Sequence, residues 1–264
     1  MDPQALIDFL GFSVGEVERF ILVLSRITGL FLSGPFFSRS AGPQRIKSAL
    51  ILSLTVVLFP LVAPWSGEGK GQVPSMLAAA VAEVIIGAIM GMLVHWVLVA
   101  VQVAGSLLGF QMGLSMAMVM DPTSGMQEGV LSNLLYLTVL MLFLSIGGHY
   151  LLLEGLARSF QTLPLGSGLP HAGNLLESAL KAMTVMFELA LLISAPIVVA
   201  TTLLYLGMGL INRASPQIQV FFLSMPVAQM IGFIILGLTM ILFGEVMMRE
   251  MNTFFAIAFK AVGF

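Results

Sequence analysis

The sequence predicts an all-α integral membrane protein, and two observations carry that prediction. Of the 264 residues, 58% are hydrophobic and only 9% are charged, with a mean hydropathy of +1.04. A soluble domain of this size needs far more charged surface. No Asp, Glu, Lys or Arg lies between Glu83 and Asp121. A membrane-spanning helix needs only about 20 apolar residues, so we expect this run to contain more than one span.

The composition also excludes several kinds of chemistry. The net charge of −2 provides no electrostatic basis for binding nucleic acid. The chain has no cysteine, which excludes disulfides, thiolate metal sites and cysteine nucleophiles. No two of its three histidines are spaced as a metal pair, and no hydrolase or phosphate-binding motif is present. We therefore expect no cofactor, no metal and no enzymatic activity.

The first long apolar segment, residues 17–37, contains three charged residues, Glu18, Arg19 and Arg26. Charges inside a membrane span are costly when they face lipid. Either these side chains extend to the interface near a helix end, or the helix packs against protein or water, and the sequence leaves both readings open. A basic stretch at residues 38–47 follows, which the positive-inside rule would place in the cytoplasm. An uncharged segment at residues 48–67 comes next.

Residues 76–103 predict a further helix, which leads into two series of residues spaced four apart. On a helix, residues four apart lie on one face. The small residues are Gly105, Gly109, Gly113 and Ala117, and the methionines are Met112, Met116 and Met120. Small residues at such spacings let helices approach closely, so we expect helix packing at Gly87, Gly91, Gly105 and Gly109. The methionines are either ordinary apolar filling or an adaptable seal.

The second half predicts three more helical segments. Residues 129–153 form one clean span, and residues 158–174 form a polar loop that marks a domain boundary, which we place between residues 175 and 176. Residues 177–212 are apolar but are interrupted by Glu188 and Pro196. A tight turn at 213–216 precedes a span at 217–244 and an amphipathic tail at 245–264. Glu83, Asp121 and Glu188 are carboxylates in or near apolar segments, and they are either functional groups or members of pairs and caps.

Several stretches resemble the FliR family of flagellar export proteins, in the same order along the chain. They cover about residues 20–240 and lie at 35–38 with Pro43 and Arg45, at 110–122, at 148–149, at 159–166 and at 209–217. The resemblance implies a FliP-like N-terminal part, residues 1–175, joined to a FliQ-like C-terminal helix pair, residues 176–264. It also implies an inner-membrane protein of the flagellar basal body, with helices largely above the membrane plane.

The resemblance further implies a structural role in a type III export gate. In that family the protein completes a pore with FliP and FliQ, works with FlhB and FlhA-like components, and passes unfolded protein. A plug loop of the family corresponds here to residues 110–121, with Phe110, Met112, Gly113, Met116, Met118, Met120 and Asp121 as its candidate residues. A cytoplasmic contact with the FlhB-like partner corresponds to Asn212, Arg213, Ser215 and Pro216.

Two other functions compete with a flagellar export gate. One is the homologous role in an injectisome. The other is a secondary transporter for a small solute, in which Glu83, Asp121 and Glu188 would bind an ion or substrate, as carboxylates near broken helices do in transporters. A transporter would work alone or as a homodimer, whereas a gate subunit needs other proteins. An intramembrane hydrolase lacks a catalytic set.

Overall fold

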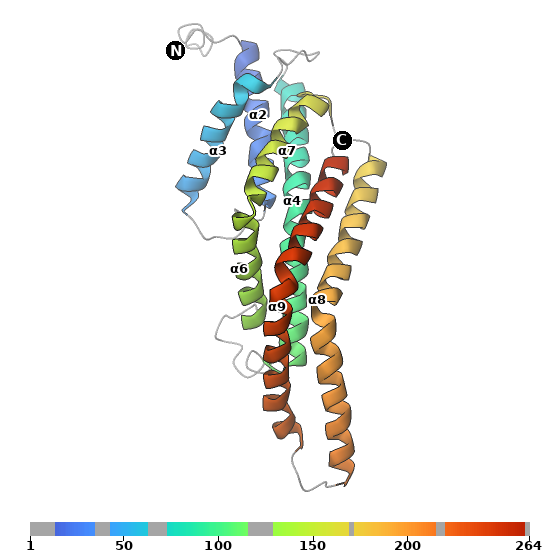
Figure 1. Ribbon diagram of the computed structural model, residues 1–264. Helices are drawn as coiled ribbons and strands as arrows, with labels where there is room; N and C mark the ends of the chain where they lie inside the picture. The colour runs from blue at the N-terminus through green and yellow to red at the C-terminus, as the bar shows by residue number, and fades with distance from the viewer. Residues whose placement is uncertain are drawn as a thin grey trace. The chain divides into compact units, whose positions relative to one another are not determined.

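The protein is built from helices, as the computed structural model shows for residues 14–34, 43–62, 73–115, 129–168, 172–214 and 220–261 (Figure 1). The elements are α2 (Val14–Ser33), α3 (Gln44–Leu58), the 3-10 turn η1 (Phe59–Leu61), α4 (Val73–Gln111), α6 (Val130–Ser145), α7 (Gly148–Thr162), α8 (Ala172–Ala214) and α9 (Val220–Ala261). Within the described ranges, four helices are long and apolar enough to cross a membrane, and the broken pair α6 and α7 would make a fifth. The prediction of an all-α membrane protein is confirmed.

Helix α4 corrects the expectation that the uncharged run contains more than one span. Its 39 residues continue to Gln111, so residues 84–111 belong to one helix. Glycine inside a helix is unfavourable by propensity, but packing can outweigh propensity. The backbones of neighbouring helices cover Gly87, Gly91 and Gly105, which explains why these glycines do not end the helix.

The segment at 129–153 is not one unbroken helix, because the chain bends by 65° between α6 and α7. Gly147 lies between the two helices with a φ of +75°, in the left-handed region that favours glycine. Helix α7 then continues to Thr162, so part of the predicted polar loop at 158–174 is helical. The described part of the loop is residues 163–168. This helix end was not predicted from the sequence.

Helices α8 and α9 are longer than the sequence predicted. Helix α8 begins at Ala172 and passes through Pro196, and α9 passes through Pro226 and includes the predicted tail as far as Ala261. Proline removes one backbone hydrogen bond from a helix, yet membrane helices tolerate it when neighbouring groups satisfy the freed carbonyl. The predicted interruption at Glu188 and Pro196 therefore does not divide α8.

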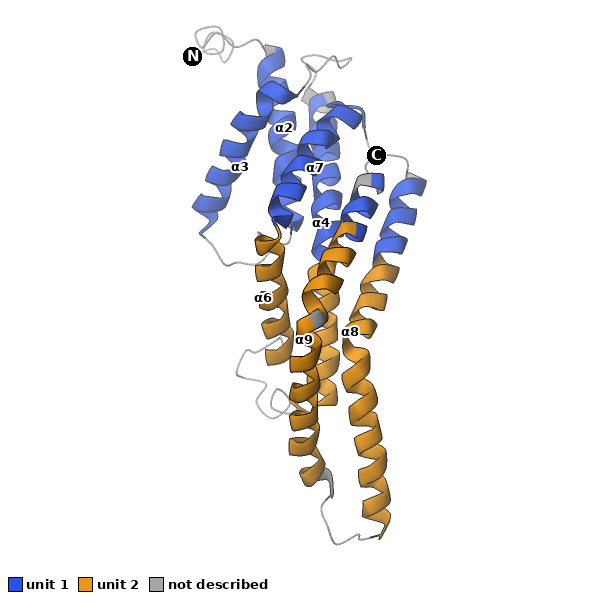
Figure 2. Ribbon diagram, viewed as in Figure 1, with its two compact units in different colours: residues 1–95, 147–182, 253–264 blue, residues 96–146, 183–252 orange. Residues whose placement is uncertain are grey.

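The chain forms two compact units that share helices (Figure 2). Unit 1 comprises Met1–His95, Gly147–Ala182 and Thr253–Phe264, and unit 2 comprises Trp96–Ile146 and Met183–Asn252. Helices α4, α8 and α9 contribute to both units. The predicted division between residues 175 and 176 concerns likeness to FliP and FliQ rather than contacts, and it stays a prediction.

Unit 1 contains a close approach of the α2 and α4 backbones. A side chain on Gly29 of α2 would collide with the carbonyl of Val84, and one on Gly87 of α4 would collide with the carbonyl of Arg26. A Cβ on Gly91 would lie 2.7 Å from the Leu30 carbonyl oxygen. Glycines on both helices therefore allow contact between the backbones themselves.

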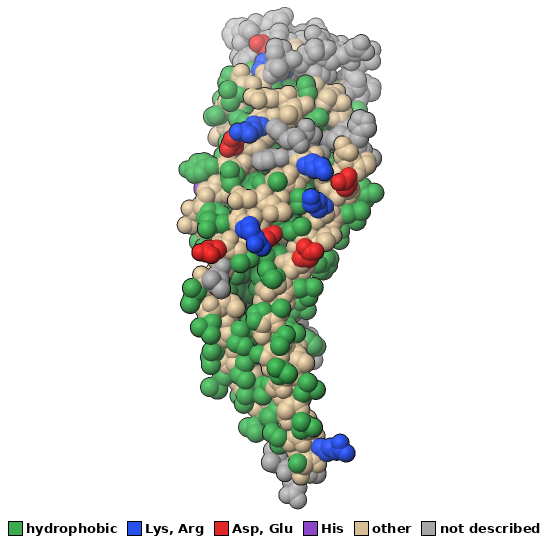
Figure 3. Space-filling model, turned by 45° about the vertical axis from the view of Figure 1, so that its right-hand side comes forward, with side chains coloured by type: hydrophobic (Ala, Val, Ile, Leu, Met, Phe, Trp, Pro, Cys, Tyr) green, Lys and Arg blue, Asp and Glu red, His purple; other side chains and the backbone are tan. Residues whose placement is uncertain are grey.

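In unit 2, α4 packs on α6, and much of the outer surface is apolar. A Cβ on Gly105 would lie 2.6 Å from the Cα of Ser132, whose hydroxyl donates to the Gln102 carbonyl at 3.1 Å. On the face seen in Figure 3, hydrophobic side chains cover much of the surface, and most of the charged side chains gather in one part of it. Exposed apolar residues of α8 and α9 in unit 2 include Leu203, Leu206, Leu210, Phe233, Ile234, Leu238 and Ile241. Such a surface requires lipid or another protein to cover it.

Candidate functional site

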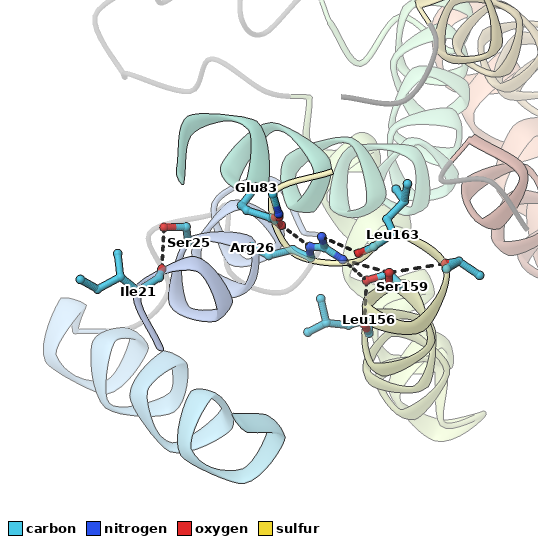
Figure 4. Close-up of polar contacts among 9 residues, drawn as sticks. Ile21, Ser25, Arg26, Glu83, Leu156, Ser159 and Leu163 are labelled. Atoms are coloured by element: carbon cyan, nitrogen blue, oxygen red, sulfur yellow. Dashed lines mark hydrogen bonds and ion pairs between the residues drawn. The ribbon is translucent and has the colours of Figure 1, made fainter. Parts of the chain in front are cut away.

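Arg26 of α2 lies at the centre of a buried polar cluster in unit 1 (Figure 4). Its Nε donates to Oε2 of Glu83 on α4 at 2.5 Å, and the two side chains are 0% and 1% exposed. Its Nη1 donates to the carbonyl and hydroxyl oxygens of Ser159 on α7, at 3.0 and 3.2 Å. Its Nη2 donates to the Leu163 carbonyl at 3.0 Å. The guanidinium therefore joins α2, α4, α7 and the loop after α7.

Two further contacts complete this group, which we call the Arg26 cluster. The second carboxylate oxygen of Glu83, Oε1, accepts a hydrogen bond from the Gly166 N–H at 3.1 Å. The Phe160 ring lies 4.5 Å from the guanidinium carbon of Arg26. A buried ion pair is tolerated only when hydrogen bonds also satisfy its remaining donors and acceptors. Both oxygens of Glu83 and all three guanidinium nitrogens of Arg26 have partners here.

Arg19, the other arginine of α2, is also directed into the protein. It donates to the carbonyl oxygens of Phe59 and Val62, and its guanidinium lies 4.5 Å from the centre of the Phe59 ring. These carbonyls lie at the end of α3 and η1, where a cation favourably occupies the negative end of a helix. Of the two readings left open for the charges of α2, packing against protein is therefore correct for Arg19 and Arg26.

Arg26 and Glu83 can each be recognised in the sequence as charges in apolar segments, but their pairing was not predicted. Residues 159–166, one of the stretches that carry the family resemblance, lie around the Arg26 guanidinium. The signal that could have found the pair is chemical: ionisable residues of opposite sign within apolar helices usually pair. Because Glu83 is fully engaged, it is not available as an ion or substrate group.

A second cluster lies in unit 2, at the C-terminal end of α4, where the predicted plug begins. The last four carbonyls of a helix lack partners within the helix. Here the Leu108 carbonyl accepts from the Met112 N–H at 2.8 Å, and the Phe110 carbonyl accepts from the Gly113 N–H at 3.0 Å. The Gly109 carbonyl accepts from the Ser115 N–H at 3.2 Å. The chain's own turn therefore satisfies three of the four.

The fourth carbonyl, that of Gln111, is satisfied from α8. The Tyr205 hydroxyl donates to it at 2.7 Å, and the Gln111 amide Nε2 donates to the Thr202 hydroxyl oxygen at 3.3 Å. On α9, a Cβ added to Gly232 would lie 2.6 Å from both Sδ and Cε of Met112, a side chain that is 0% exposed. The end of α4 is thus fixed against both α8 and α9.

The structure describes only the first residues of the predicted plug. Phe110 is 76% exposed on the last turn of α4, Met112 is buried, and Gly113 has a φ of +74° in the following turn. Met116, Met118, Met120 and Asp121 lie outside the described residues. Because α4 ends at Gln111, the predicted helical face does not extend to Gly113. That part of the helical prediction is wrong, since the left-handed glycine ends the helix.

Other candidate residues occupy different surroundings. Gly105 packs on α6, whereas the nearest atom to a Cβ on Gly109 is Ser115 Oγ at 3.7 Å, in the turn after α4 itself. Asn212 and Arg213 are exposed on the last turn of α8. Ser215 and Pro216 lie outside the described residues. Glu188 is exposed on α8, and no group of three metal-ligating side chains is present in the described part of the chain.

The chain is similar to known bacterial export proteins. A family model described as bacterial export proteins, family 1, matches residues 17–254. The flagellar biosynthetic protein FliR of Escherichia coli is 31% identical over 219 residues, 82% of each chain. The FliR of Bacillus subtilis is 32% identical over 120 residues, so the match spans 46% of that protein's length and 45% of this chain. The secretion system apparatus protein SsaT of Salmonella typhimurium is 33% identical over 86 residues, 33% of each chain.

Replacing Arg26 by Met should destabilise the protein by about 3–5 kcal/mol, because Glu83 is left charged, buried and unpaired. Arg26→Met/Glu83→Met should recover most of that loss, since apolar side chains of similar volume often replace a buried pair at little cost. Thermal unfolding of the purified protein, with its partners, measures both variants.

The matched control is Arg158→Met, which removes an arginine from the exposed pair that Arg158 forms with Glu154 at 2.6 Å. It should cost less than about 1 kcal/mol. Equal stability of Arg26→Met and Arg158→Met would contradict the role given to the Arg26 cluster.

Proposed function

The chain belongs to the bacterial export proteins of family 1, and from that membership we propose that it is a structural, non-enzymatic component of a flagellar type III protein export gate. In this role it completes a pore with FliP and FliQ, through which unfolded flagellar subunits leave the cell. The observation that carries the proposal is the match to the family over residues 17–254, together with the similarity to FliR over 82% of the chain.

A flagellar role is favoured over an injectisome role by the extent of the similarity. The match to the E. coli FliR covers 219 residues, whereas the match to SsaT covers 86. A small-solute transporter is disfavoured by the geometry, because Glu83, one of the three carboxylates it would use, is committed to Arg26 and Gly166.

The gate is located in the bacterial inner membrane, in the export apparatus of the flagellar basal body. The exposed apolar surface of α8 and α9 supports this assignment, because lipid or other subunits must cover it. We assign FliP-like character to residues 1–175 and FliQ-like character to residues 176–264, which contain α8 except for its first four residues and the whole of α9. FlhB-like and FlhA-like proteins complete the set of partners.

The seal of the pore is the segment of residues 110–121. Its methionines supply an apolar, adaptable surface that can close an irregular opening. The fixed end of α4 supports this proposal, since a closing segment needs a firm starting point. The end of α8 and the residues that follow it face the cytoplasm and contact an FlhB-like partner through Asn212, Arg213, Ser215 and Pro216.

Co-expression with FliP and FliQ should yield one stable particle that contains all three proteins. The chain expressed alone should aggregate, because its exposed apolar surface lacks a cover. Size-exclusion chromatography of detergent extracts measures both outcomes. A monodisperse chain purified alone that reconstitutes solute uptake would count against the gate.

A cysteine at Ser215 should crosslink to an FlhB-like partner in cells. The chain has no native cysteine, so Ser215→Cys introduces a single reactive thiol. Leu203→Cys, at an exposed apolar residue inside α8, is the control that should not crosslink to this partner. Labelling of the Ser215→Cys thiol by an impermeant reagent only from the periplasm would overturn the cytoplasmic placement.

Deleting residues 113–119 should leave the complex assembled but make it leak small ions. The deleted residues are the part of the proposed seal that follows Met112, whose side chain packs against Gly232 of α9. Membrane depolarisation in cells measures the leak, and co-purification measures assembly. If the assembled complex stays tight, the seal lies elsewhere. If the complex is lost, Met116→Ser/Met118→Ser provides the milder variant for the same measurement.

A further inference from the structure

Residues of α8 and α9 hold the end of α4, and neither the sequence nor the similarity to FliR had indicated that these residues have a function. Among the described residues, the Gln111 carbonyl takes its hydrogen bond from the Tyr205 hydroxyl at 2.7 Å. In apolar surroundings an unpaired backbone carbonyl is strongly unfavourable. The exposed surface around Tyr205 on α8 is apolar, with Leu203 and Leu206 as neighbours in the sequence. The Tyr205 hydroxyl is the partner that the described residues provide for this helix end.

Gly232 provides the second contact. Met112 fills the space where the side chain of any other residue at position 232 would lie, with Met112 Cγ only 2.8 Å from an ideal Cβ. Gly237, five residues further along α9, has nothing within 4 Å of its ideal Cβ. A side chain at position 232 would therefore collide with Met112, whereas a Cβ at position 237 would contact no other atom.

Gly113 marks the residue at which the chain leaves the helix. It follows the end of α4 by two residues with a φ of +74°, and its ideal Cβ lies 3.6 Å from Met225 Cγ of α9. Gly105, by contrast, is packed against the backbone of α6 and remains helical. The contacts of Gln111 and Met112 therefore set the direction in which the chain leaves α4. Gly105, which is packed inside the helix, does not contribute a bend.

We propose that Tyr205, Thr202 and Gly232 are positioning residues that hold the end of α4 in the place required for a closed gate. The proposal rests on the proposed gate function and adds the residues that regulate it. Loss of one of these contacts raises the population of complexes whose α4 end is displaced, and these complexes leak while remaining assembled.

The first test measures ion leakage and protein export in cells that contain the complete export apparatus. Tyr205→Phe removes one hydrogen bond, and we expect the leak to rise about two- to tenfold. Gly232→Ala and Gly232→Val should give a graded increase as the added side chain displaces Met112. Gly237→Ala and Gly237→Val are the matched controls on the same helix, and Tyr150→Phe, at an exposed tyrosine of unit 1, is the control for the hydroxyl. All variants should still co-purify with their partners.

A reversible crosslink separates positioning from a general structural effect. An ideal Cβ at position 232 lies 2.8 Å from Met112 Cγ, close to the separation between Cβ and the opposite sulfur in a disulfide. Met112→Cys/Gly232→Cys/Tyr205→Phe should leak when reduced with dithiothreitol and become tight after oxidation with diamide. The oxidised variant should still export flagellar protein, because the locked residues belong to the fixed part of the gate.

The outcomes distinguish this proposal from the gate function on which it rests. If deletion of residues 113–119 causes a leak but Tyr205→Phe and Gly232→Val are as tight as their controls, the positioning role is wrong and the plug stands. If the oxidised crosslink stops export, the end of α4 must move, and the positioning role is again wrong. If the deletion leaves a complex that is assembled and does not leak, the proposed plug itself is wrong. Should Gly232→Val prevent assembly, Tyr205→Phe and the crosslink still decide the matter.

Discussion

The structure of unit 1 depends on the burial of Arg26. A guanidinium with no exposed surface is tolerable only where each of its nitrogens finds an acceptor, and the acceptors here come from α4, α7 and the loop after α7. The carbonyl of the same residue lies against Gly87, where the absence of a side chain brings α4 close enough for Glu83 to reach the guanidinium. The ion pair between Arg26 and Glu83 and the close contact between the α2 and α4 backbones therefore depend on each other.

Unit 2 is stabilised by different means. Its hydrogen bonds join small polar groups to backbone carbonyls, as between Ser132 and Gln102 and between Tyr205 and Gln111. The ion pair between Arg249 and Glu250 joins two neighbouring residues of α9 and is partly exposed. This difference corresponds to the charge pattern of the chain: no charged residue lies between Glu188 and Arg213, or between Arg213 and Glu245.

The sequence predicted the helical class and most helices, because long apolar runs have few alternatives in a membrane protein. Helix boundaries were less predictable, because proline and glycine can either end a helix or lie inside one. Pro196 lies inside α8 and Gly87 lies inside α4, whereas a helix ends at Gly147. For a glycine, the outcome depends on whether the backbone of another helix packs against it, and the periodicity of the sequence carries no information about such packing. The pairing of Arg26 with Glu83 could not be predicted from periodicity either, because the two residues lie 57 positions apart on different helices.

The exposed apolar surface of α8 and α9 has a consequence for the lifetime of the protein in the cell. A surface that only lipid or other subunits can cover remains exposed on every newly made chain until its cover arrives. Quality-control proteases and chaperones act on chains of this kind. The amount of the protein that accumulates then depends on the supply of what covers α8 and α9 as well as on its own rate of synthesis.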